Sequence, residues 1–285
     1  MTLCTGEKRI TAWFLSISLL IAASVTSLSA KIIDGESARH TSDDPTTLEA
    51  RIAEASGYGF ACEKDTGSLN LVQFNGHIVL IGTEHGFYHD DGTKSCHDDF
   101  RIVHPDDHYN NQAAIDHSRG YALDLTPLNE TSLLRTRAPA NSDEKGFDLA
   151  IFRILDLEAL HRYNGKPRMI KSLMAMPSDD LIEISNSSQV FILGGRDNYF
   201  NFSRSGFEQG CSIEAATGLN SVFRHDCDTG GGSSGATLDI MKDGTLYSLG
   251  MHYGAYQTSP SIWENYFISA QEIARQLESL FPADL

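Results

Sequence analysis

The stretch Leu71-Val-Gln-Phe-Asn-Gly-His-Ile-Val-Leu-Ile81 is the clearest indication of fold class in this chain of 285 residues. Two apolar runs flank the pair Asn75-Gly76. An Asn-Gly pair between such runs is the strongest short-range signal of a β-hairpin, because both residues accept positive φ angles. The segment therefore predicts two antiparallel strands joined by a tight turn.

Other parts of the chain extend this pattern. Strand-like runs occur at residues 147–154, 189–193, 237–240 and 245–251, the last two around the turn pair Asp243-Gly244. Only residues 270–281 have the apolar spacing of a long amphipathic helix packed on the outside of the protein. The sequence predicts a mainly β protein with a C-terminal helix.

Composition limits the possible partners. With 41% hydrophobic and 21% charged residues, the chain is able to bury the core of one larger domain or two half-domains. Its formal net charge of -16 repels phosphate backbones, and no Lys/Arg cluster with interleaved aromatic residues offsets that charge. We do not expect a nucleic-acid partner.

The N-terminal segment has the pattern of a signal peptide, residues 1–30. Lys8 and Arg9 precede an apolar run at 13–25 and a small-residue stretch at 26–30. An uncleaved anchor is the alternative, but the run is shorter than the roughly 20 residues that span a membrane. We therefore expect a secreted or periplasmic protein without membrane contact after cleavage, with a propeptide-like segment at 31–58 and a main domain at 59–285.

Cysteine usage agrees with export. Cys4 leaves with the signal peptide, and an even number remains: Cys62, Cys96, Cys211 and Cys227. An even count in an exported protein indicates two disulfides. Of the three possible pairings we favour Cys62 with Cys96 and Cys211 with Cys227, because each pair brackets one reactive segment. A zinc site is the competing interpretation, but no CxxC spacing occurs.

The segment that is most informative about function is His225-Asp-Cys-Asp-Thr-Gly-Gly-Gly-Ser-Ser-Gly-Ala-Thr-Leu238. Its glycines allow a substrate to approach the main chain closely. A serine nucleophile needs a base, and its tetrahedral intermediate needs donors such as the N–H groups of Gly232 and Ser234. The alternatives are a flexible loop, a phosphate loop and a nucleophile elbow. A phosphate loop requires Gly-Lys-Ser/Thr, which is absent from this segment. A nucleophile elbow requires glycine at the position of Ala236.

Four segments together resemble the trypsin/chymotrypsin family of serine peptidases. Residues 79–87 look like the family's strand ending in Thr-Ala-Ala-His-Cys, and residues 101–109 resemble its Val-His-Pro stretch. Residues 147–154 are similar to Asp-Ile-Ala-Leu-Leu-Arg-Leu, and residues 232–237 to Gly-Asp-Ser-Gly-Gly-Pro. The family presents His, Asp and Ser in this order, and so does this chain.

The resemblance implies a role for each matching residue. Ser234 attacks the scissile carbonyl, His85 takes and returns the proton, and Asp148 orients the imidazole. The N–H groups of Gly232 and Ser234 form the oxyanion hole. The implied fold is two six-stranded antiparallel β-barrels, at about 59–165 and 166–285, with the C-terminal helix. We expect a monomer that acts on proteins or peptides, without a cofactor or a metal.

Some positions depart from the family. Ser233 replaces the aspartate that pairs with the new N-terminal amine after activation, although Lys31-Ile-Ile-Asp-Gly35 resembles an activation site. Glu84 adds an unexpected charge beside His85. A catalytically inactive homologue acting as a secreted binding protein is therefore the alternative function, and an esterase of unrelated fold is the third.

The predicted substrate pocket carries opposing signals. Asp228 stands where trypsin places the carboxylate that binds Lys or Arg, or else it is a turn residue beside Cys227. Gly250-Met-His252-Tyr253-Gly254 resembles the segment of glutamyl endopeptidases whose histidine helps bind an acidic side chain, or else His252 is an ordinary strand residue. If Asp228 and His252 pair, the pocket accepts neither charge well.

Two further patterns have ordinary explanations. Histidine and aspartate residues between 89 and 108 suggest a calcium site, but a solvated acidic loop is the better interpretation. Asn129, Asn186 and Asn201 lie in Asn-x-Ser/Thr sequons, which matter only in a glycosylating host.

Overall fold

The computed structural model describes residues 58–62, 65–88, 101–103, 123–124, 148–158, 169–187, 190–193, 207–216, 221–230, 232–259 and 262–282. The predicted signal peptide, residues 31–57, Cys96, most of the His/Asp-rich stretch at 89–108, Asn129 and Asn201 lie outside these ranges.

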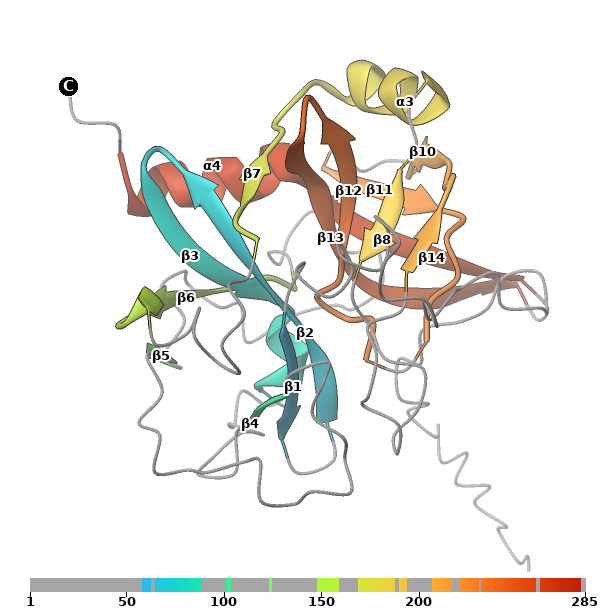
Figure 1. The fold of residues 1–285 in the computed structure, drawn as a ribbon. Coiled ribbons are helices and arrows are strands. Elements are labelled where there is room, and N and C mark those ends of the chain that lie inside the picture. The colour runs from blue at the N-terminus through green and yellow to red at the C-terminus, as the bar shows by residue number, and fades with distance from the viewer. Residues whose placement is uncertain are drawn as a thin grey trace, which may run out of the picture.

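The described part is mainly β, as predicted (Figure 1). The strands of the first part of the chain are β1 (Tyr58–Cys62), β2 (Asp65–Phe74), β3 (His77–Gly82), β4 (Arg101–Val103), β5 (Leu123–Asp124), β6 (Ala150–Ile154) and β7 (Lys171–Leu173). Those of the second part are β8 (Phe191–Leu193), β9 (Phe207–Gln209), β10 (Ile213–Ala215), β11 (Val222–His225), β12 (Thr237–Lys242), β13 (Thr245–Ser259) and β14 (Ile262–Ser269). The helical elements are the 3₁₀ turn η1 (Glu84–Gly86), α3 (Ser178–Ser187) and α4 (Ala270–Leu280).

One connected 14-stranded sheet joins both parts of the chain. Its main path runs β10-β11-β14-β13-β7-β2-β3-β6-β5. The short strand β7 is the link, because it pairs in parallel with β2 on one side and with β13 on the other. In Figure 1 it lies between the β2–β3 hairpin and the β12–β14 strands. The strand pairing thus shows one mixed sheet and does not separate two barrels.

Both predicted hairpin turns are confirmed. Asn75 and Gly76 have φ angles of 47° and 80°, and Asp243 and Gly244 have 51° and 75°. Two successive positive φ angles match the right-handed twist of the flanking strands, which explains why these residue pairs form tight turns. The strands on either side, β2 with β3 and β12 with β13, pair antiparallel.

The predicted C-terminal helix is confirmed as α4. The Ser269 hydroxyl accepts a hydrogen bond from the N–H of Glu272 and caps its first turn. Ile273 and Leu277 are fully buried against the sheet. This core combines residues from both parts of the chain, because it also contains Ile81 on β3 and Met251 on β13.

Helix α3 was not predicted, since only residues 270–281 showed the apolar spacing of a long amphipathic helix. Its sequence, Ser-Asp-Asp-Leu-Ile-Glu-Ile-Ser-Asn-Ser, is rich in residues of low helix propensity. Tertiary packing compensates, since Leu181 is buried in a cluster with Val190 and Ile213. Asn186 of the predicted sequon lies in this helix.

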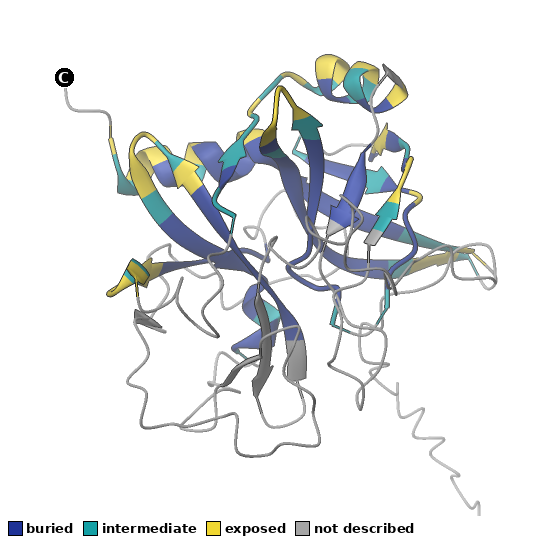
Figure 2. Cartoon of the chain, viewed as in Figure 1, coloured by how far each residue is buried: buried dark blue, intermediate teal, exposed yellow. Residues whose placement is uncertain are grey.

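Burial follows the long strands. In Figure 2 the buried residues occupy the middle of β2, β3, β12 and β13, while exposed residues gather at the hairpin tips. Within the described ranges, no helix is long and apolar enough to cross a membrane.

Candidate active site

His85 lies in the turn that follows β3. The carbonyl oxygen of Glu84 accepts hydrogen bonds from the N–H groups of Phe87 and Tyr88, at 2.8 and 3.0 Å, which closes η1 around the histidine. The side chain of His85 keeps 15% of its surface exposed, whereas Glu84 is fully buried. The unexpected carboxylate beside the histidine therefore belongs to the interior, and the imidazole is the more exposed of the two side chains.

Asp148 holds His85 at two points. Its Oδ1 atom accepts a hydrogen bond from the backbone N–H of His85 at 2.9 Å, and its Oδ2 atom makes a short hydrogen bond with Nδ1 of the imidazole. The side chain of Asp148 is only 4% exposed. Because both carboxylate oxygens are engaged, the ring has one preferred orientation, with Nδ1 carrying the proton toward Asp148.

Ser234 lies on the opposite side of the imidazole. Its Oγ atom is 3.1 Å from Nε2 of His85. With the proton on Nδ1, the unprotonated Nε2 accepts the hydrogen bond from the Ser234 hydroxyl. Residues from three distant parts of the sequence thus form one hydrogen-bonded chain, and this is the arrangement that converts a hydroxyl into a nucleophile.

The loop that carries Ser234 lies against β2. The backbone N–H of Ser68 donates to the carbonyl oxygen of Ser234 at 2.7 Å, and the Ser68 hydroxyl donates to the carbonyl oxygen of Gly232 at 3.0 Å. Gly232 and Gly235 both have a φ of 89°. Glycine is needed for this backbone path, because other residues rarely adopt such angles.

The predicted oxyanion donors are the N–H groups of Gly232 and Ser234. Within the described residues, neither group donates to a backbone acceptor. A developing oxyanion needs donors that are not already engaged, since it gains most from hydrogen bonds that are in place before the reaction. In the part of the chain that the structure describes, the two N–H groups are thus not committed to a backbone carbonyl, and their role as oxyanion donors stays a prediction.

Ser233, the departure from the family pattern, is fully buried. Its hydroxyl accepts a hydrogen bond from the N–H of Gly230 at 2.9 Å, and its own N–H donates to the Gly230 carbonyl at 3.0 Å. The serine therefore closes the turn locally. No ionic partner is needed at this position.

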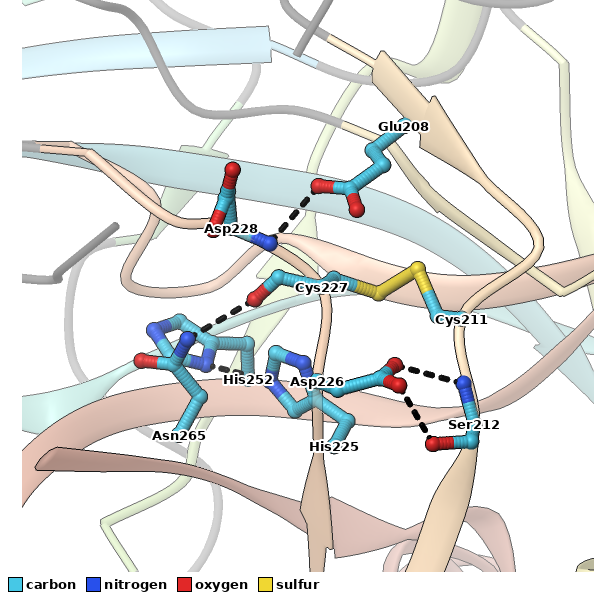
Figure 3. Close-up of a disulfide and its surroundings, with 9 residues drawn as sticks. All are labelled: Glu208, Cys211, Ser212, His225, Asp226, Cys227, Asp228, His252 and Asn265. Carbon is cyan, nitrogen blue, oxygen red and sulfur yellow. Dashed lines mark hydrogen bonds between the residues drawn. A yellow bond between two sulfur atoms is a disulfide. The ribbon is translucent and has the colours of Figure 1, made fainter. Parts of the chain in front are cut away.

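Asp228 and His252 of the predicted pocket are both buried. The Asp228 N–H donates to Oε2 of Glu208 at 2.6 Å. His252 makes a hydrogen bond of 2.9 Å between its Nδ1 atom and Nε2 of His225. In Figure 3 the Asp228 carboxylate points away from the two imidazoles. The structure therefore pairs His252 with His225 instead of Asp228.

His225 was missed by sequence reasoning. Burial lowers its pKa to about 3, so the imidazole is neutral near neutral pH. Its position at the start of the Gly-rich segment gave no sign of a partner 27 residues away. The pairing depends on β11 and β13 both lying beside β14, which no local pattern reveals.

The other two predicted pocket residues lie in the middle of β13. Tyr253 is packed in the core with Leu149 and Ile151, and burial, with the nearby charge of Asp148, raises the pKa of its hydroxyl. Gly254 pairs with Tyr266 at an irregularity of the β13–β14 register.

A disulfide joins Cys211 to Cys227, directly before Asp228 (Figure 3). The amide of buried Asn265 donates to the carbonyl oxygen of Cys227 at 2.8 Å, which fixes the same segment from the other side. Cys62 lies in β1, but its predicted partner Cys96 is outside the described residues. That second pairing stays a prediction.

Comparison with known proteins gives structural matches only. No protein family model and no curated protein matches the chain. Among solved structures, Rv3671c from M. tuberculosis H37Rv in an inactive form is 14% identical, with 84% of this chain and 94% of that chain covered and a TM-score of 0.46. The thermostable serine protease AL20 from an extremophilic microorganism is 12% identical, with 81% and 98% covered and a TM-score of 0.49.

Proposed function

We propose that this chain is a secreted serine endopeptidase that hydrolyses peptide bonds through an acyl-enzyme. The observation that carries the proposal is the position of His85, whose two ring nitrogens lie within hydrogen-bond reach of Asp148 and Ser234. A hydroxyl aligned with an oriented imidazole is the arrangement required for nucleophilic acyl transfer.

The reaction has two halves. In the first, Oγ of Ser234 attacks the carbonyl carbon while Nε2 of His85 takes its proton. The resulting imidazolium is stabilised by Asp148 and returns the proton to the leaving amine. In the second half, water attacks the acyl-enzyme, and His85 again takes and returns the proton. The N–H groups of Gly232 and Ser234 stabilise the oxyanion in both halves. No cofactor enters these steps.

Secretion and the two-barrel fold belong to the same proposal. The disulfide between Cys211 and Cys227 fits an oxidising compartment outside the cytosol. The two groups of strands on either side of β7 fit two half-domains at about 59–165 and 166–285, with the site between them.

A fluorophosphonate probe tests the nucleophile. The full chain is expressed for export, purified and incubated with the probe, and the modified peptide is identified by mass spectrometry. We expect one adduct on Ser234 of the wild type and none in Ser234→Ala. A wild-type protein that stays unlabelled after N-terminal processing contradicts the proposal and favours the inactive, binding homologue.

A peptide-library digest tests the reaction and the pocket. Cleavage of peptides by the wild type, and not by Ser234→Ala, separates an endopeptidase from an esterase. Because Asp228 is buried and the His225 partner of His252 is neutral, we expect cleavage after uncharged residues to exceed cleavage after Lys, Arg, Asp or Glu. A strict preference for one charge contradicts this specificity.

A further inference from the structure

A fully buried lysine lies beside the loop of Ser234. Lys171 on β7 has no exposed surface, and its ammonium nitrogen contacts three oxygen atoms. They are Oδ2 of Asp239 at 2.7 Å, Oδ1 of Asn70 at 2.8 Å and the hydroxyl oxygen of Thr237. A protonated lysine has three N–H donors, so each donor has an acceptor and the ammonium form is fully satisfied.

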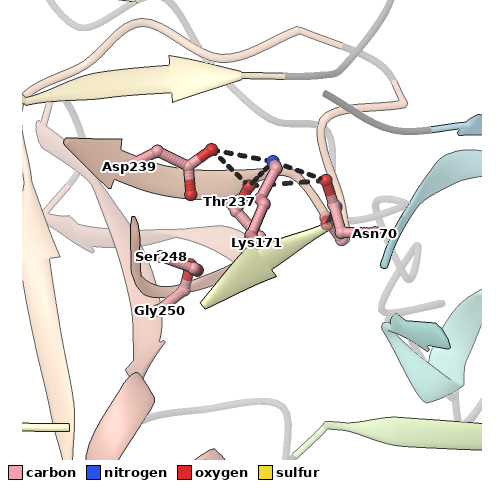
Figure 4. A network of polar contacts seen from close by, with 7 residues as sticks. Asn70, Lys171, Thr237, Asp239, Ser248 and Gly250 are labelled. Atoms are coloured by element: carbon pink, nitrogen blue, oxygen red, sulfur yellow. Dashed lines mark hydrogen bonds and ion pairs between the residues drawn. The ribbon is translucent and has the colours of Figure 1, made fainter. Parts of the chain in front are cut away.

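These residues meet because of strand register. Lys171 pairs with Val72 on β2, two residues after Asn70, so the Asn70 side chain emerges on the same face of the sheet as that of Val72. Thr237 and Asp239 are two apart on β12, and the Thr237 hydroxyl donates to Oδ2 of Asp239 at 2.9 Å, so both side chains reach the same place. Figure 4 shows the amine of Lys171 between Asp239 and Asn70.

Lys171 and the Gly235 carbonyl together determine which way the Asn70 amide points. The carbonyl and amino groups of an asparagine are interchangeable in shape, and only their hydrogen-bond partners distinguish them. An ammonium group accepts no hydrogen bond, so the Oδ1 atom of Asn70 must face Lys171. The Nδ2 amino group is then on the other side, where it donates to the carbonyl oxygen of Gly235 at 2.6 Å.

Gly235 directly follows the nucleophile. Its carbonyl is held by Asn70, and the preceding carbonyl, of Ser234, is held by the backbone N–H of Ser68. Two consecutive peptide groups at the nucleophile are therefore fixed by one strand, β2. Rotation of the second peptide would break the Asn70 contact and move the Ser234 Oγ atom relative to His85.

We propose that Asn70 is a positioning residue for Ser234, and that the buried pair Lys171–Asp239 holds the Oδ1 end of its amide in place. The expected effect on the labelling rate rests on the proposed peptidase function. The expected effect on the rigidity of the Ser234 loop does not. A buried ion pair is weak evidence for stability, because desolvation costs about as much as the attraction returns. An ammonium group donates a hydrogen bond to Oδ1 of Asn70, and an apolar pair at these two positions would not.

The first test is Asn70→Asp, which keeps the shape and the acceptor facing Lys171 but removes the donor to Gly235. Leu277→Ala on α4 is the matched control, because it destabilises the shared core away from the Ser234 loop. We expect fluorophosphonate labelling of Asn70→Asp to slow by about 100-fold, as for other displaced reacting groups. Leu277→Ala should label at close to the wild-type rate despite a lower melting temperature.

The second variant separates positioning from stability. Removing one member of the ion pair would strand a buried charge, so Lys171→Met and Asp239→Leu are combined. Apolar replacement of both partners is often neutral for stability. We expect a melting temperature near that of the wild type together with slower labelling, since Oδ1 of Asn70 then loses its Lys171 donor and the amide is held mainly through Gly235. Labelling at the wild-type rate in both Asn70→Asp and the double variant overturns the proposal.

Hydrogen exchange gives a readout that needs no activity. The N–H of Gly235 donates to the carbonyl of His252 on β13, and the N–H of Ala236 donates to the carbonyl of Ser233 within the loop. In Asn70→Asp we expect the peptide covering 230–238 to exchange roughly tenfold faster, the effect of losing about one hydrogen bond. Exchange no faster than in Leu277→Ala overturns the positioning role. If the wild type is not labelled but Asn70→Asp still shows the faster exchange, the peptidase function is contradicted and the positioning role is not.

Discussion

The backbone N–H of Ser68 donates a hydrogen bond of 2.7 Å to the carbonyl oxygen of Ser234, residues that are far apart in the sequence. This contact places β2 directly against the loop that carries Ser234. It requires Gly235, because a Cβ atom there would lie 1.9 Å from the carbonyl oxygen of Ser68. β2 and the Ser234 loop are therefore able to approach this closely because residue 235 is a glycine and has no side chain.

Gly235→Ala should prevent the loop from packing on β2. The methyl group meets backbone atoms that cannot move aside, and the φ of 89° adds strain. We expect a loss of several kcal/mol in the free energy of unfolding, beyond the roughly 1–2 kcal/mol of a left-handed residue alone. Gly244→Ala is the control, since its φ is 75° but no atom lies within 4 Å of the added Cβ. Equal urea midpoints for the two variants would contradict the steric explanation.

Asp148→Asn should abolish most of the activity without unfolding the protein. An asparagine of the same shape presents an N–H where the imidazole Nδ1–H needs an acceptor, so the ring changes tautomer. In Ser-His-Asp peptidases this change lowers kcat by about 10⁴-fold. Peptide hydrolysis and the melting temperature should be measured on the same preparation. Activity within tenfold of wild type would show that Asp148 does not orient the general base.

Ser233→Ala should destabilise the loop that carries Ser234. The variant leaves the N–H of Gly230 without its acceptor in a partly buried turn, which costs about 1 kcal/mol or more. Ser279→Ala is the matched control, because Ser279 also uses its hydroxyl within three residues, on the exposed side of α4. Urea denaturation of both variants provides the comparison. Similar losses for the two would show that the Ser233 hydroxyl has no special role.

Local patterns predicted the local structure. The turns at Asn75-Gly76 and Asp243-Gly244 and the helix α4 follow from short-range residue preferences, and all are present. Helix α3 was missed because its stability comes from the packing of Leu181 and not from its own propensity. The sequence order of His85, Asp148 and Ser234 suggested that they meet, but it carried no distances.

Contacts between distant strands were not predictable in the same way. Lys171 belongs to a three-residue strand, and its partners Asn70 and Asp239 are 101 and 68 positions away. A lysine is normally exposed, so nothing in the sequence marked this one as buried. The same holds for His225 and His252, whose pairing depends on the register of three strands. Contacts of this kind depend on how the strands pair in the sheet, which the sequence does not state.

The stability of the protein should decline in acid in part through His225. Burial lowers its pKa to about 3, whereas a histidine in the unfolded chain has a pKa of about 6.5. Between these values the unfolded state binds a proton that the folded state does not, so the free energy of unfolding falls as the pH is lowered through this window. The slope from this one group is at most about 1.4 kcal/mol per pH unit, and it vanishes above about pH 6.5.

Urea denaturation of the wild type and His225→Gln at pH 4.5 and pH 7.5 measures this contribution. Glutamine keeps a hydrogen-bond donor toward His252 but does not titrate, so the variant should lose less stability between the two pH values than the wild type. His77→Gln is the control, because this imidazole is exposed on the β2–β3 hairpin and stays in contact with water in the folded protein. Carboxylates also titrate in this window, but they contribute equally to all three proteins. Identical pH slopes for wild type and His225→Gln would mean that His225 is protonated in the folded protein, and that the pair with His252 carries a charge.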